Sequence, residues 1–274
     1  MTLNHRQWRF ICDEPAAGRW NMAVDEAILN AVGSGEQPPT LRLYAWDPAC
    51  LSLGISQAVS DADGAAIAGQ RWDIVRRPTG GRAILHTDEL TYSLSVPADH
   101  ELAKLDIISS YRKISTALMI ALDMLGANPQ SAPRTGPVIQ KPNAVCFETP
   151  SHYEITSGGR KLVGSAQMRR KVGLLQHGTL PLFGDVARIC DALHYATEGE
   201  REGAKIMVRQ RAASLADVIG RPVTWDEAAA AVADGFRAAF EADLIESALS
   251  GSELDDATSL EAAKYGAADH IYAR

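Results

Sequence analysis

Residues 90–96 read Leu-Thr-Tyr-Ser-Leu-Ser-Val, and apolar side chains alternate with polar ones through the whole stretch. Successive side chains of a β-strand point to opposite faces of its sheet, so this alternation indicates a half-buried strand. We expect Leu90, Tyr92, Leu94 and Val96 to face a core. The stretch therefore predicts a sheet with one face packed against other elements and the other face more exposed.

Other segments with regular patterns lie on both sides of this strand. Ile107 to Leu125 repeats apolar residues at helical spacing and is followed by Gly126, a typical helix terminator. Asn21 is a suitable cap for a helix that runs to about Val32. Further strands are expected at Thr40–Tyr44, Trp72–Arg76, Tyr153–Ile155, Lys161–Val163 and Leu174–Leu180.

The C-terminal part of the chain predicts helices. Thr224 followed by Glu227 forms a capping-box pattern before an alanine-rich helix that runs to about Leu244. Residues 127–144 hold four prolines and predict a long loop. Antiparallel-looking strands with separate helices favour an α/β protein of the α+β type, with mixed, largely antiparallel sheets and flanking helices. Because no repeat or linker appears, we expect residues 1–274 to form a single domain.

Composition and charge exclude several classes of protein. The formal net charge is −7, whereas nucleic-acid-binding proteins usually carry a basic surplus, so no nucleic-acid partner is expected. No run of about 18 or more apolar residues predicts a membrane span. Residues 1–10 lack the apolar centre of a signal peptide. We therefore expect a cytoplasmic protein with no membrane contact.

The four cysteines, Cys12, Cys50, Cys146 and Cys190, are scattered and form no Cys-x-x-Cys pair, so neither zinc nor a disulfide is expected. Cys12, Cys50 and Cys190 lie in apolar runs and are interpreted as small core residues. Cys146 differs because it follows the proline-rich loop, where a thiol is more accessible than in a buried strand. A packed, unreactive thiol is the alternative interpretation for Cys146.

A glycine pair follows one of the predicted strands. Residues 76–86 read Arg-Arg-Pro-Thr-Gly-Gly-Arg-Ala-Ile-Leu-His. Gly80 and Gly81 remove side chains where backbone must approach a ligand, and free N–H groups in such a turn bind an anionic or carbonyl oxygen. Arg77, Arg82 and His86 add donors nearby. An ordinary strand turn with exposed arginines is the alternative.

Two further motifs follow later in the chain. Residues 158–167 read Gly-Gly-Arg-Lys-Leu-Val-Gly-Ser-Ala-Gln and place Lys161 between two glycine turns. An ammonium near a thiol lowers the pKa of the thiol and supplies a nucleophilic thiolate, although Lys161 could equally be an exposed strand end. Residues 176–179 read Gln-His-Gly-Thr, in which His177 is either a structural histidine or a ligand contact.

Together these motifs resemble the lipoate–protein ligase, octanoyltransferase and biotin–protein ligase superfamily. The resemblance extends from about Trp8 to Phe240 and includes residues 21–26, Asn-Met-Ala-Val-Asp-Glu. Cys146-Phe147, followed by Pro-Ser-His-Tyr-Glu at residues 150–154, is similar to the LipM type of octanoyltransferase, whose nucleophile is the cysteine before a phenylalanine. Thr87 departs from the pattern, because the family's histidine is followed directly by aspartate.

The resemblance implies that Cys146 is the acyl-thioester nucleophile and that Lys161 depresses the pKa of its thiol. The substrate-binding residues that it implies are Arg77, Gly80, Gly81, His86, Gly164, Ser165, Ala166, His177 and Gly178. Backbone N–H groups at residues 164–166 are candidates to stabilise a tetrahedral oxyanion.

The implied donor is octanoyl-acyl carrier protein, and the implied acceptor is a lysine of a lipoyl-domain protein such as the glycine-cleavage H protein. No ATP, other cofactor or metal ion is expected, because the donor is already activated. The basic run Arg169-Arg170-Lys171 is either a solvated turn or a landing site for an acidic carrier protein.

Three alternatives remain at the level of sequence. An ATP-dependent lipoate–protein ligase would usually show a third glycine where this chain has Arg82, and it needs no cysteine. An amidotransferase of the LipL type, which moves octanoyl between two lipoyl-bearing proteins, also uses a cysteine and is harder to separate. A non-catalytic module that binds acyl chains or lipoyl domains would form no covalent intermediate.

Overall fold

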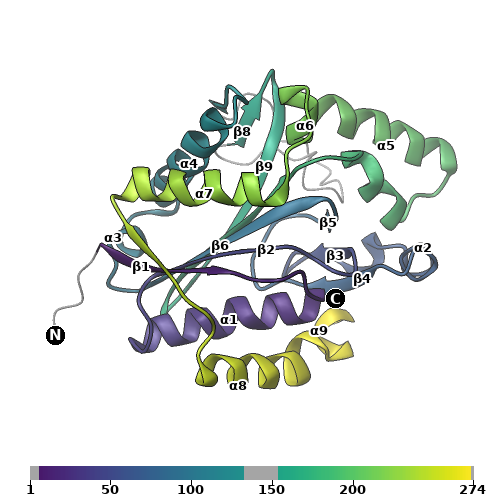
Figure 1. Ribbon diagram of the computed structural model, residues 1–274. Helices are drawn as coiled ribbons and strands as arrows, with labels where there is room; N and C mark the ends of the chain where they lie inside the picture. Colours follow the sequence, from purple (N-terminus) through teal and green to yellow (C-terminus); the bar gives the residue numbers. More distant parts are fainter. Residues whose placement is uncertain (1–5, 133–153, 273–274) are drawn as a thin grey trace.

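An eight-stranded sheet forms the centre of the protein (Figure 1). The computed structural model describes residues 6–132 and 154–272. The strands follow the order β11-β1-β2-β6-β10-β9-β8-β7. Their bounds are β1 Gln7–Cys12, β2 Thr40–Tyr44, β6 Glu89–Pro97, β7 Gln130–Ala132, β8 Glu154–Ser157, β9 Arg160–Arg170, β10 Gly173–Pro181 and β11 Asp243–Glu246. β1 runs parallel to β2 and β11, whereas the other neighbours are antiparallel, which confirms the mixed, largely antiparallel sheet.

A second, three-stranded sheet has the order β4-β3-β5. Its strands are β3 Cys50–Leu53, β4 Asp73–Arg76 and β5 Ile84–His86. The α-helices are α1 Gly18–Ser34, α2 Gly64–Gly69, α3 Glu101–Lys104, α4 Ile107–Met124, α5 Glu198–Arg211, α6 Leu215–Ile219, α7 Trp225–Phe240, α8 Gly251–Leu260 and α9 Ala268–Tyr272. Shorter turns of helix are η1 Val59–Asp61, η3 Val186–Ala192 and the π-helical η4 Glu261–Tyr265. Within the described ranges, none of the helices is both long and apolar enough to cross a membrane.

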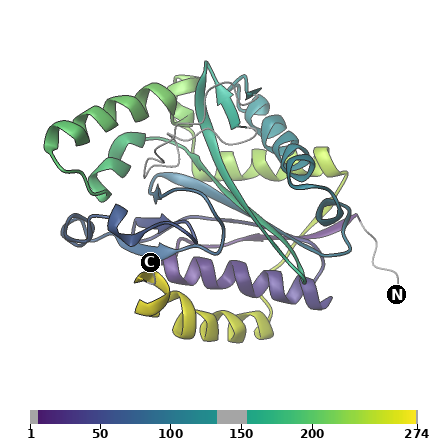
Figure 2. The ribbon, with the colours of Figure 1, turned by 180° about the vertical axis from the view of Figure 1, so that it is seen from behind.

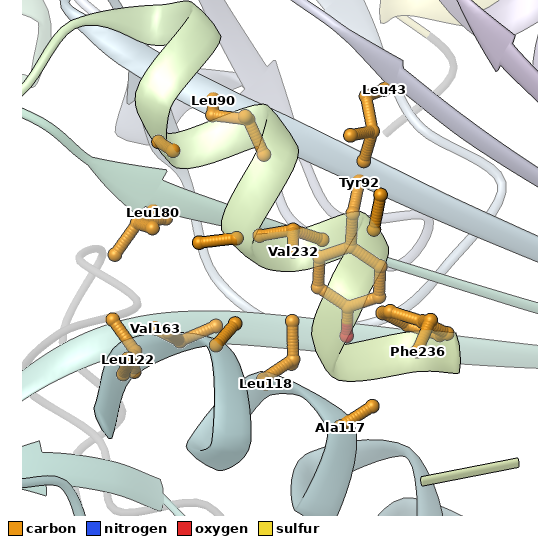
Figure 3. Packing of buried hydrophobic residues seen from close by; sticks show 14 of the residues in the cluster. Leu43, Leu90, Tyr92, Ala117, Leu118, Leu122, Val163, Leu180, Val232 and Phe236 are labelled. Atoms are coloured by element: carbon orange, nitrogen blue, oxygen red, sulfur yellow. The ribbon is translucent and has the colours of Figure 1, made fainter. Parts of the chain in front are cut away.

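Helices α4 and α7 cover one face of the larger sheet, as both views show (Figures 1 and 2). Figure 3 shows the core between them, where Leu90 and Tyr92 of β6 meet Leu118 of α4 and Val232 and Phe236 of α7. These side chains are all nearly or fully buried. The apolar half of the alternating pattern in residues 90–96 therefore faces this core, as predicted.

Helix α1 covers the opposite face of the sheet, with α8 packed outside it (Figure 1). Buried ion pairs hold these C-terminal elements in place. Glu253 of α8 accepts two hydrogen bonds from the guanidinium of Arg9 in β1, one of them 2.7 Å long. Glu26 of α1 accepts hydrogen bonds from Lys264 and Tyr265, which lie in η4. The sheet is thus enclosed on both faces.

This second covering layer makes the prediction of a half-buried strand wrong for β6. Every residue of β6 except Pro97 is buried, including Thr91, Ser93 and Ser95 on the polar face. The reason is that α1 lies over that face. Polar side chains in such a position need internal partners, and Thr91 Oγ1 accepts a 2.9 Å hydrogen bond from Trp46 Nε1.

The helix termini differ in places from the sequence prediction. Helix α1 begins at Gly18, so Asn21 is not its cap, and the Asn21 amide donates instead to the carbonyls of Ala16 and Ala45. Thr224 caps α7 by accepting from the Glu227 N–H at 3.1 Å. The Glu227 carboxylate pairs with Arg221 instead of completing the predicted capping box.

Several strands were missed or shortened by the sequence prediction. Helix α7 ends at Phe240 because Glu241 adopts a left-handed conformation with φ of 48°, and the chain then forms β11 beside β1. β7 lies in the first part of the segment predicted as a loop, residues 127–144, and the rest of that segment lies outside the described residues. β9 continues to Arg170, well beyond the predicted Lys161–Val163.

Two of the three cysteines expected in the core are there. Cys50 and Cys190 are fully buried, which confirms their prediction. Cys12 is exposed, so its prediction is wrong. It is the last residue of β1, and only the four residues in the middle of that strand are buried.

We expect Gly235→Ala to lower the free energy of unfolding by about 1–3 kcal/mol, the usual cost of overpacking. A Cβ at Gly235 of α7 would lie 2.2 Å from the carbonyl oxygen of Ala117 in α4, so the two helices would have to separate. Urea unfolding measures the change. Gly203→Ala in α5 is the matched control, because nothing lies within 4 Å of its Cβ position, and it should stabilise by about 1 kcal/mol. Equal effects of the two substitutions would contradict this account of helix packing.

Candidate functional site

A pocket lies on the α1 side of the larger sheet, between that sheet and the smaller one. Its lining combines apolar, aromatic and titratable side chains: Met22, Tyr44, Trp46, Ser52, Arg77, Ile84, His86, Thr91, Gly164, Ala166, His177, Gly178 and Thr179. Six of the substrate-binding residues predicted from the sequence are among them, namely Arg77, His86, Gly164, Ala166, His177 and Gly178. The fold therefore brings together motifs that are far apart in the chain.

Strand alternation decides which side chains of β9 and β10 enter the pocket. The Ser165 side chain turns to the opposite face, where its Oγ lies 2.8 Å from the Tyr92 hydroxyl. A Cβ at Gly178 would lie 2.6 Å from Cε1 of the same Tyr92 ring. Gly178 is therefore required for packing against Tyr92, although its backbone lines the pocket. The Ser165 side chain does not join the predicted pocket residues.

Arg77 holds the glycine turn in place. Its guanidinium donates to the carbonyl oxygens of Gly80 at 2.8 Å, Arg82 at 2.7 Å and Ser52 at 2.9 Å. It also donates to Ser52 Oγ at 3.1 Å. Only 3% of Arg77 is exposed. An arginine has five N–H donors, and those of Arg77 are directed largely at protein oxygens, so its first role is to fix the turn.

The two glycines of this turn have different environments. Gly81 has a φ of 94°, a conformation that favours glycine. Its carbonyl oxygen lies 2.1 Å from the position of a Cβ at Gly54, so the two backbones are in close contact. Gly80 is exposed, and nothing lies within 4 Å of its Cβ position. Glycine is therefore required at position 81 by the backbone conformation, whereas Gly80 is exposed and can contact a ligand at the surface.

His177 belongs to a buried polar network that begins on α1. Its Nδ1 lies 3.1 Å from Oδ2 of Asp25, and its Nε2 lies 2.7 Å from Oγ1 of Thr79. Asp25 also accepts from Arg42 at 2.9 Å and from the Tyr44 hydroxyl at 3.0 Å. Burial alone would raise the pKa of Asp25, but the hydrogen bonds from His177 and Arg42 lower it below its ordinary value. Asp25 is therefore ionised and holds a proton on His177 Nδ1.

His86 belongs to a second network on the other side of the pocket. Its Nδ1 lies 2.7 Å from Oε1 of Glu89, and its Nε2 lies 2.8 Å from Oγ of Ser52. The imidazole stacks on Trp46 with ring centroids 3.9 Å apart. Thr91 also donates to Glu89. Sequence reasoning missed Asp25, Ser52 and Trp46 as individual site residues, because their partners are distant in the chain. It also missed Glu89, although His86 lies only three residues before it.

Lys161 is buried beside the pocket. Only 3% of it is exposed, and its Nζ donates to Oε1 of Glu154 at 2.9 Å. Its Cε lies 4.0 Å from the Cβ position of Gly164, a pocket residue. The interpretation of Lys161 as an exposed strand end is therefore wrong, and the structure places its ammonium in the interior.

A β-bulge explains this orientation of Lys161. Ile155 pairs with Val163 and Thr156 pairs with Lys161, so one residue of β9, Leu162, has no opposite partner in β8. Leu162 and Val163 are consecutive, yet both belong to the apolar core. The extra residue shifts Lys161 onto the pocket face, a common effect of bulges next to active sites.

Cys146 lies outside the described residues, so its position relative to Lys161 stays a prediction. Across residues 6–132 and 154–272, no three histidine, cysteine or carboxylate side chains are grouped so that they could hold a metal ion. The basic run at residues 169–171 is partly committed to internal contacts. Arg169 donates to the carbonyls of Ala103 and Leu105, and Arg170 pairs with Glu26.

The sequence is similar to a family of known proteins over most of its length. Residues 17–237 match the family model described as the lipoyl protein ligase A/B catalytic domain. The chain is 36% identical over 265 residues to octanoyltransferase LipM of Brevibacillus brevis, covering 94% of this chain and 96% of that one. It is 38% identical over 271 residues to octanoyltransferase LipM of Kyrpidia tusciae, covering 97% and 98%. The same enzyme of Bacillus subtilis is 36% identical, covering 99% and 100%.

Solved structures of ligases share the fold. A bipartite lipoate protein ligase from Thermoplasma acidophilum superposes with a TM-score of 0.81 at 24% identity, covering 98% of this chain and 97% of that one. Lipoate-protein ligase A bound with ATP gives a TM-score of 0.80 at 24% identity, covering 97% and 98%. At this identity the likeness establishes the arrangement of the elements and not the reaction.

We expect the free energy of unfolding to fall as the pH is lowered through about 6.5, the ordinary pKa of histidine. Burial lowers the pKa of His177, despite its hydrogen bond to Asp25. His177 therefore binds a proton less readily in the folded protein than in the unfolded chain. The contribution of His177 is complete above pH 6.5 and is lost as the pH falls toward its folded-state pKa.

Urea unfolding between about pH 7.5 and pH 5.5 measures this dependence. His177→Gln should make it shallower, and the exposed His194→Gln should leave it unchanged. The pKa of His270 is also lowered by burial, and His270 contributes equally to the pH dependence of unfolding in both variants. An unchanged slope in His177→Gln would contradict the prediction.

Proposed function

The chain belongs to the lipoyl protein ligase A/B catalytic domain family and is an octanoyltransferase, and from this premise we propose that Cys146 carries the octanoyl group as a thioester with Lys161 as its cationic partner. The reaction requires an octanoyl donor and a lipoyl-accepting protein. The observation that carries the proposal is the buried ammonium of Lys161 beside the pocket. Cys146 precedes Lys161 by fifteen positions in the chain.

The burial of Lys161 supports a functional role. Lysine is almost never fully buried unless its charge is paired, and one carboxylate, Glu154, lies 2.9 Å from Nζ. An ammonium in the interior interacts more strongly with a nearby thiolate than it would in water. A Cys146 thiol brought next to Lys161 would therefore ionise at a lower pH than an ordinary cysteine.

The proposed reaction has two half-reactions. The Cys146 thiolate attacks the donor's thioester carbonyl, the donor's C–S bond breaks, and the donor thiolate leaves and takes up a proton. Octanoyl is then held on Cys146 by another thioester, at little net energy change. The amine of an acceptor lysine next attacks that carbonyl, forms an amide, and releases the Cys146 thiolate. Two steps of this kind give ping-pong kinetics.

The pocket offers a suitable place for the acyl chain. Met22, Trp46 and Ile84 supply apolar surface, and each buried CH₂ contributes about 0.8 kcal/mol. We assign substrate contacts to His86, His177 and the backbone at Gly164 and Ala166, which all line it. Backbone N–H groups at residues 164–166 remain our candidates for the oxyanion site.

The proposed donor is octanoyl-acyl carrier protein, and the proposed acceptor is a lysine of a lipoyl-domain protein such as the glycine-cleavage H protein. A LipL-type enzyme would instead take octanoyl from a lipoyl-bearing protein, so the choice of donor separates the two activities. We also propose that residues 1–274 act as a single catalytic domain, since the two sheets share one pocket.

We expect the wild-type protein, mixed with octanoyl-acyl carrier protein in the absence of ATP, to gain one octanoyl group on Cys146. Intact-protein mass spectrometry followed by peptide mapping measures this gain. Cys146→Ala should gain nothing, because it has no thiol to acylate. Cys12→Ala is the matched control, because Cys12 is an exposed thiol at the C-terminal end of β1, and this variant should be loaded normally. Loading of Cys146→Ala to the wild-type level would contradict the assignment.

Replacement of Lys161 by methionine should raise the pKa of the Cys146 thiol toward about 8.5, the value of an ordinary cysteine. Each unit of increase lowers the thiolate fraction at neutral pH by about tenfold. The pH dependence of Cys146 alkylation by iodoacetamide, followed by mass spectrometry, measures the pKa. The exposed Lys171→Met is the control and should behave as wild type. Identical alkylation profiles for Lys161→Met and wild type would remove Lys161 from the mechanism.

A further inference from the structure

The second half-reaction needs a group that accepts a proton. An amine that attacks a thioester carbonyl forms a C–N bond and must lose a proton before a stable amide is left. Lys161 is a poor acceptor, because it is proposed to stay an ammonium and its Nζ already donates to Glu154. Another base is therefore required near the pocket.

We propose that Ser52, His86 and Glu89 form a proton relay that takes this proton from the attacking amine. The proposal rests on the Cys146 thioester proposed above. Ser52 Oγ lies 2.8 Å from His86 Nε2, and His86 Nδ1 lies 2.7 Å from Glu89 Oε1. A hydroxyl, an imidazole and a carboxylate in this order form the arrangement that activates nucleophiles in many acyl-transfer enzymes.

The neighbours of the relay fix where its protons are. Thr91 accepts a hydrogen bond from Trp46, so its own hydroxyl proton is directed to Glu89. Thr179 also donates to Glu89. Because these hydroxyl groups donate to Glu89, its carboxylate acts as an acceptor toward His86 as well, and we assign the shared proton to His86 Nδ1. The Nε2 atom of His86 is then left as an acceptor.

The other end of the relay is fixed in the same way. Arg77 donates to Ser52 Oγ at 3.1 Å, so the Ser52 hydroxyl proton points to His86 Nε2. Ser52, His86 and Glu89 are 0%, 5% and 6% exposed, which shields these hydrogen bonds from competing water. In the resting relay, Nδ1 of His86 therefore donates to Glu89, and the Ser52 hydroxyl donates to Nε2 of His86.

The relay lies next to the proposed reacting centre. Ser52 and His86 both line the pocket. Thr179 connects the relay with Lys161, because its hydroxyl donates to Glu89 while its methyl lies 3.8 Å from the Cβ position of Gly164. The Lys161 Cε lies 4.0 Å from the same position. A carbonyl held near Lys161 would therefore be close to the relay.

A similar chain, formed by Thr79, His177 and Asp25, reaches the pocket only through His177, with distances of 2.7 and 3.1 Å. It is less suited to the task. Its hydroxyl is not among the described groups that line the pocket, whereas Ser52 is. Burial also lowers the pKa of His177, which disfavours its imidazolium form. We therefore assign the proton to His86 and a substrate-orienting role to His177.

The proposed step transfers octanoyl from the sulfur of Cys146 to the nitrogen of the acceptor lysine. The acceptor lysine first loses one proton to water and enters as a neutral amine. Its nitrogen bonds to the thioester carbonyl carbon, and the C–S bond to Cys146 breaks with the electron pair leaving on sulfur. The remaining excess proton moves from nitrogen to Ser52 Oγ, while the Ser52 proton moves to His86 Nε2. Glu89 stabilises the resulting imidazolium until the proton is released to water.

Single-turnover experiments separate the relay from the thioester. Octanoyl is first loaded onto Cys146 from octanoyl-acyl carrier protein, and the loaded protein is then mixed with a lipoyl-domain acceptor. Because His86 also contacts the substrate, the variant and wild type are compared only after both are loaded to the same extent. We expect loaded His86→Gln to transfer octanoyl to the acceptor lysine at least about 100-fold more slowly than loaded wild type, the usual range for loss of a general base. Hydroxylamine, a weakly basic nucleophile that needs little help with its proton, should discharge variant and wild type at similar rates.

Further variants make the test specific. Glu89→Gln, which replaces the positioning carboxylate, should show the same split between lysine and hydroxylamine. His177→Gln should slow both nucleophiles alike, and the exposed His194→Gln should behave as wild type. Ser52→Ala, which removes only the hydroxyl, repeats the comparison if His86→Gln does not fold.

Two results would overturn the relay alone. One is wild-type transfer to the lysine acceptor by folded His86→Gln and Ser52→Ala, and the other is an equal loss with lysine and hydroxylamine. A split seen only in His177→Gln would move the base to the other histidine and would also overturn the proposal. Failure of the wild-type protein to load octanoyl would instead overturn the thioester, and the relay with it.

Discussion

The buried ion pair between Arg42 and Asp25 connects the fold to the site. Arg42 lies in β2 and Asp25 lies in α1, so the 2.9 Å contact holds the helix against the sheet. Removing one partner of such a pair leaves an uncompensated buried charge, at a cost of about 3–5 kcal/mol. The second oxygen of the same carboxylate orients His177. The interaction that positions α1 therefore also sets the hydrogen-bonding state of a pocket histidine.

The pocket exists because the polar face of the central sheet is covered rather than exposed. Once α1 lies over β6, the buried Thr91 side chain needs internal partners, and these partners are groups of the site. Thr91 links Trp46 to Glu89, and Thr179 links Glu89 to the wall beside Lys161. An alternating strand with an ordinary solvated face would have offered no such set of buried donors. The covering helix and the small sheet thus turn a polar strand face into a binding site.

Sequence reasoning worked where local pattern decides the outcome. Helix α4 and strand β2 follow their periodicity closely. Gly164, Gly178 and the two motif histidines meet at the pocket, whereas Gly80 and Gly81 are not among its lining residues. It failed where a tertiary contact overrides the pattern. Asn21 does not cap α1, because its side chain bonds to two carbonyls and to Arg42. β11 was not predicted, because it forms by pairing with the edge of β1. Ser52 gave no local signal, because its partner His86 lies 34 residues further along the chain. Glu89 follows His86 by three residues, but the pairing of the two depends on the turn between β5 and β6.

The two adjacent arginines of the glycine motif, Arg76 and Arg77, mainly hold backbone and hydroxyl groups in place. Arg76 donates to the carbonyls of Gly54 and Gln57 and, through other N–H groups, to the carbonyl of Ile271 in α9. Arg77 binds the carbonyls of the glycine turn itself and directs the Ser52 hydroxyl. Both are buried, and a lysine in either position would supply one compact charge in place of a planar fork with five donors. The sequence Arg-Arg-x-x-Gly-Gly is therefore best understood as a scaffold that sets backbone and hydroxyl groups, on which the titratable residues of the pocket depend.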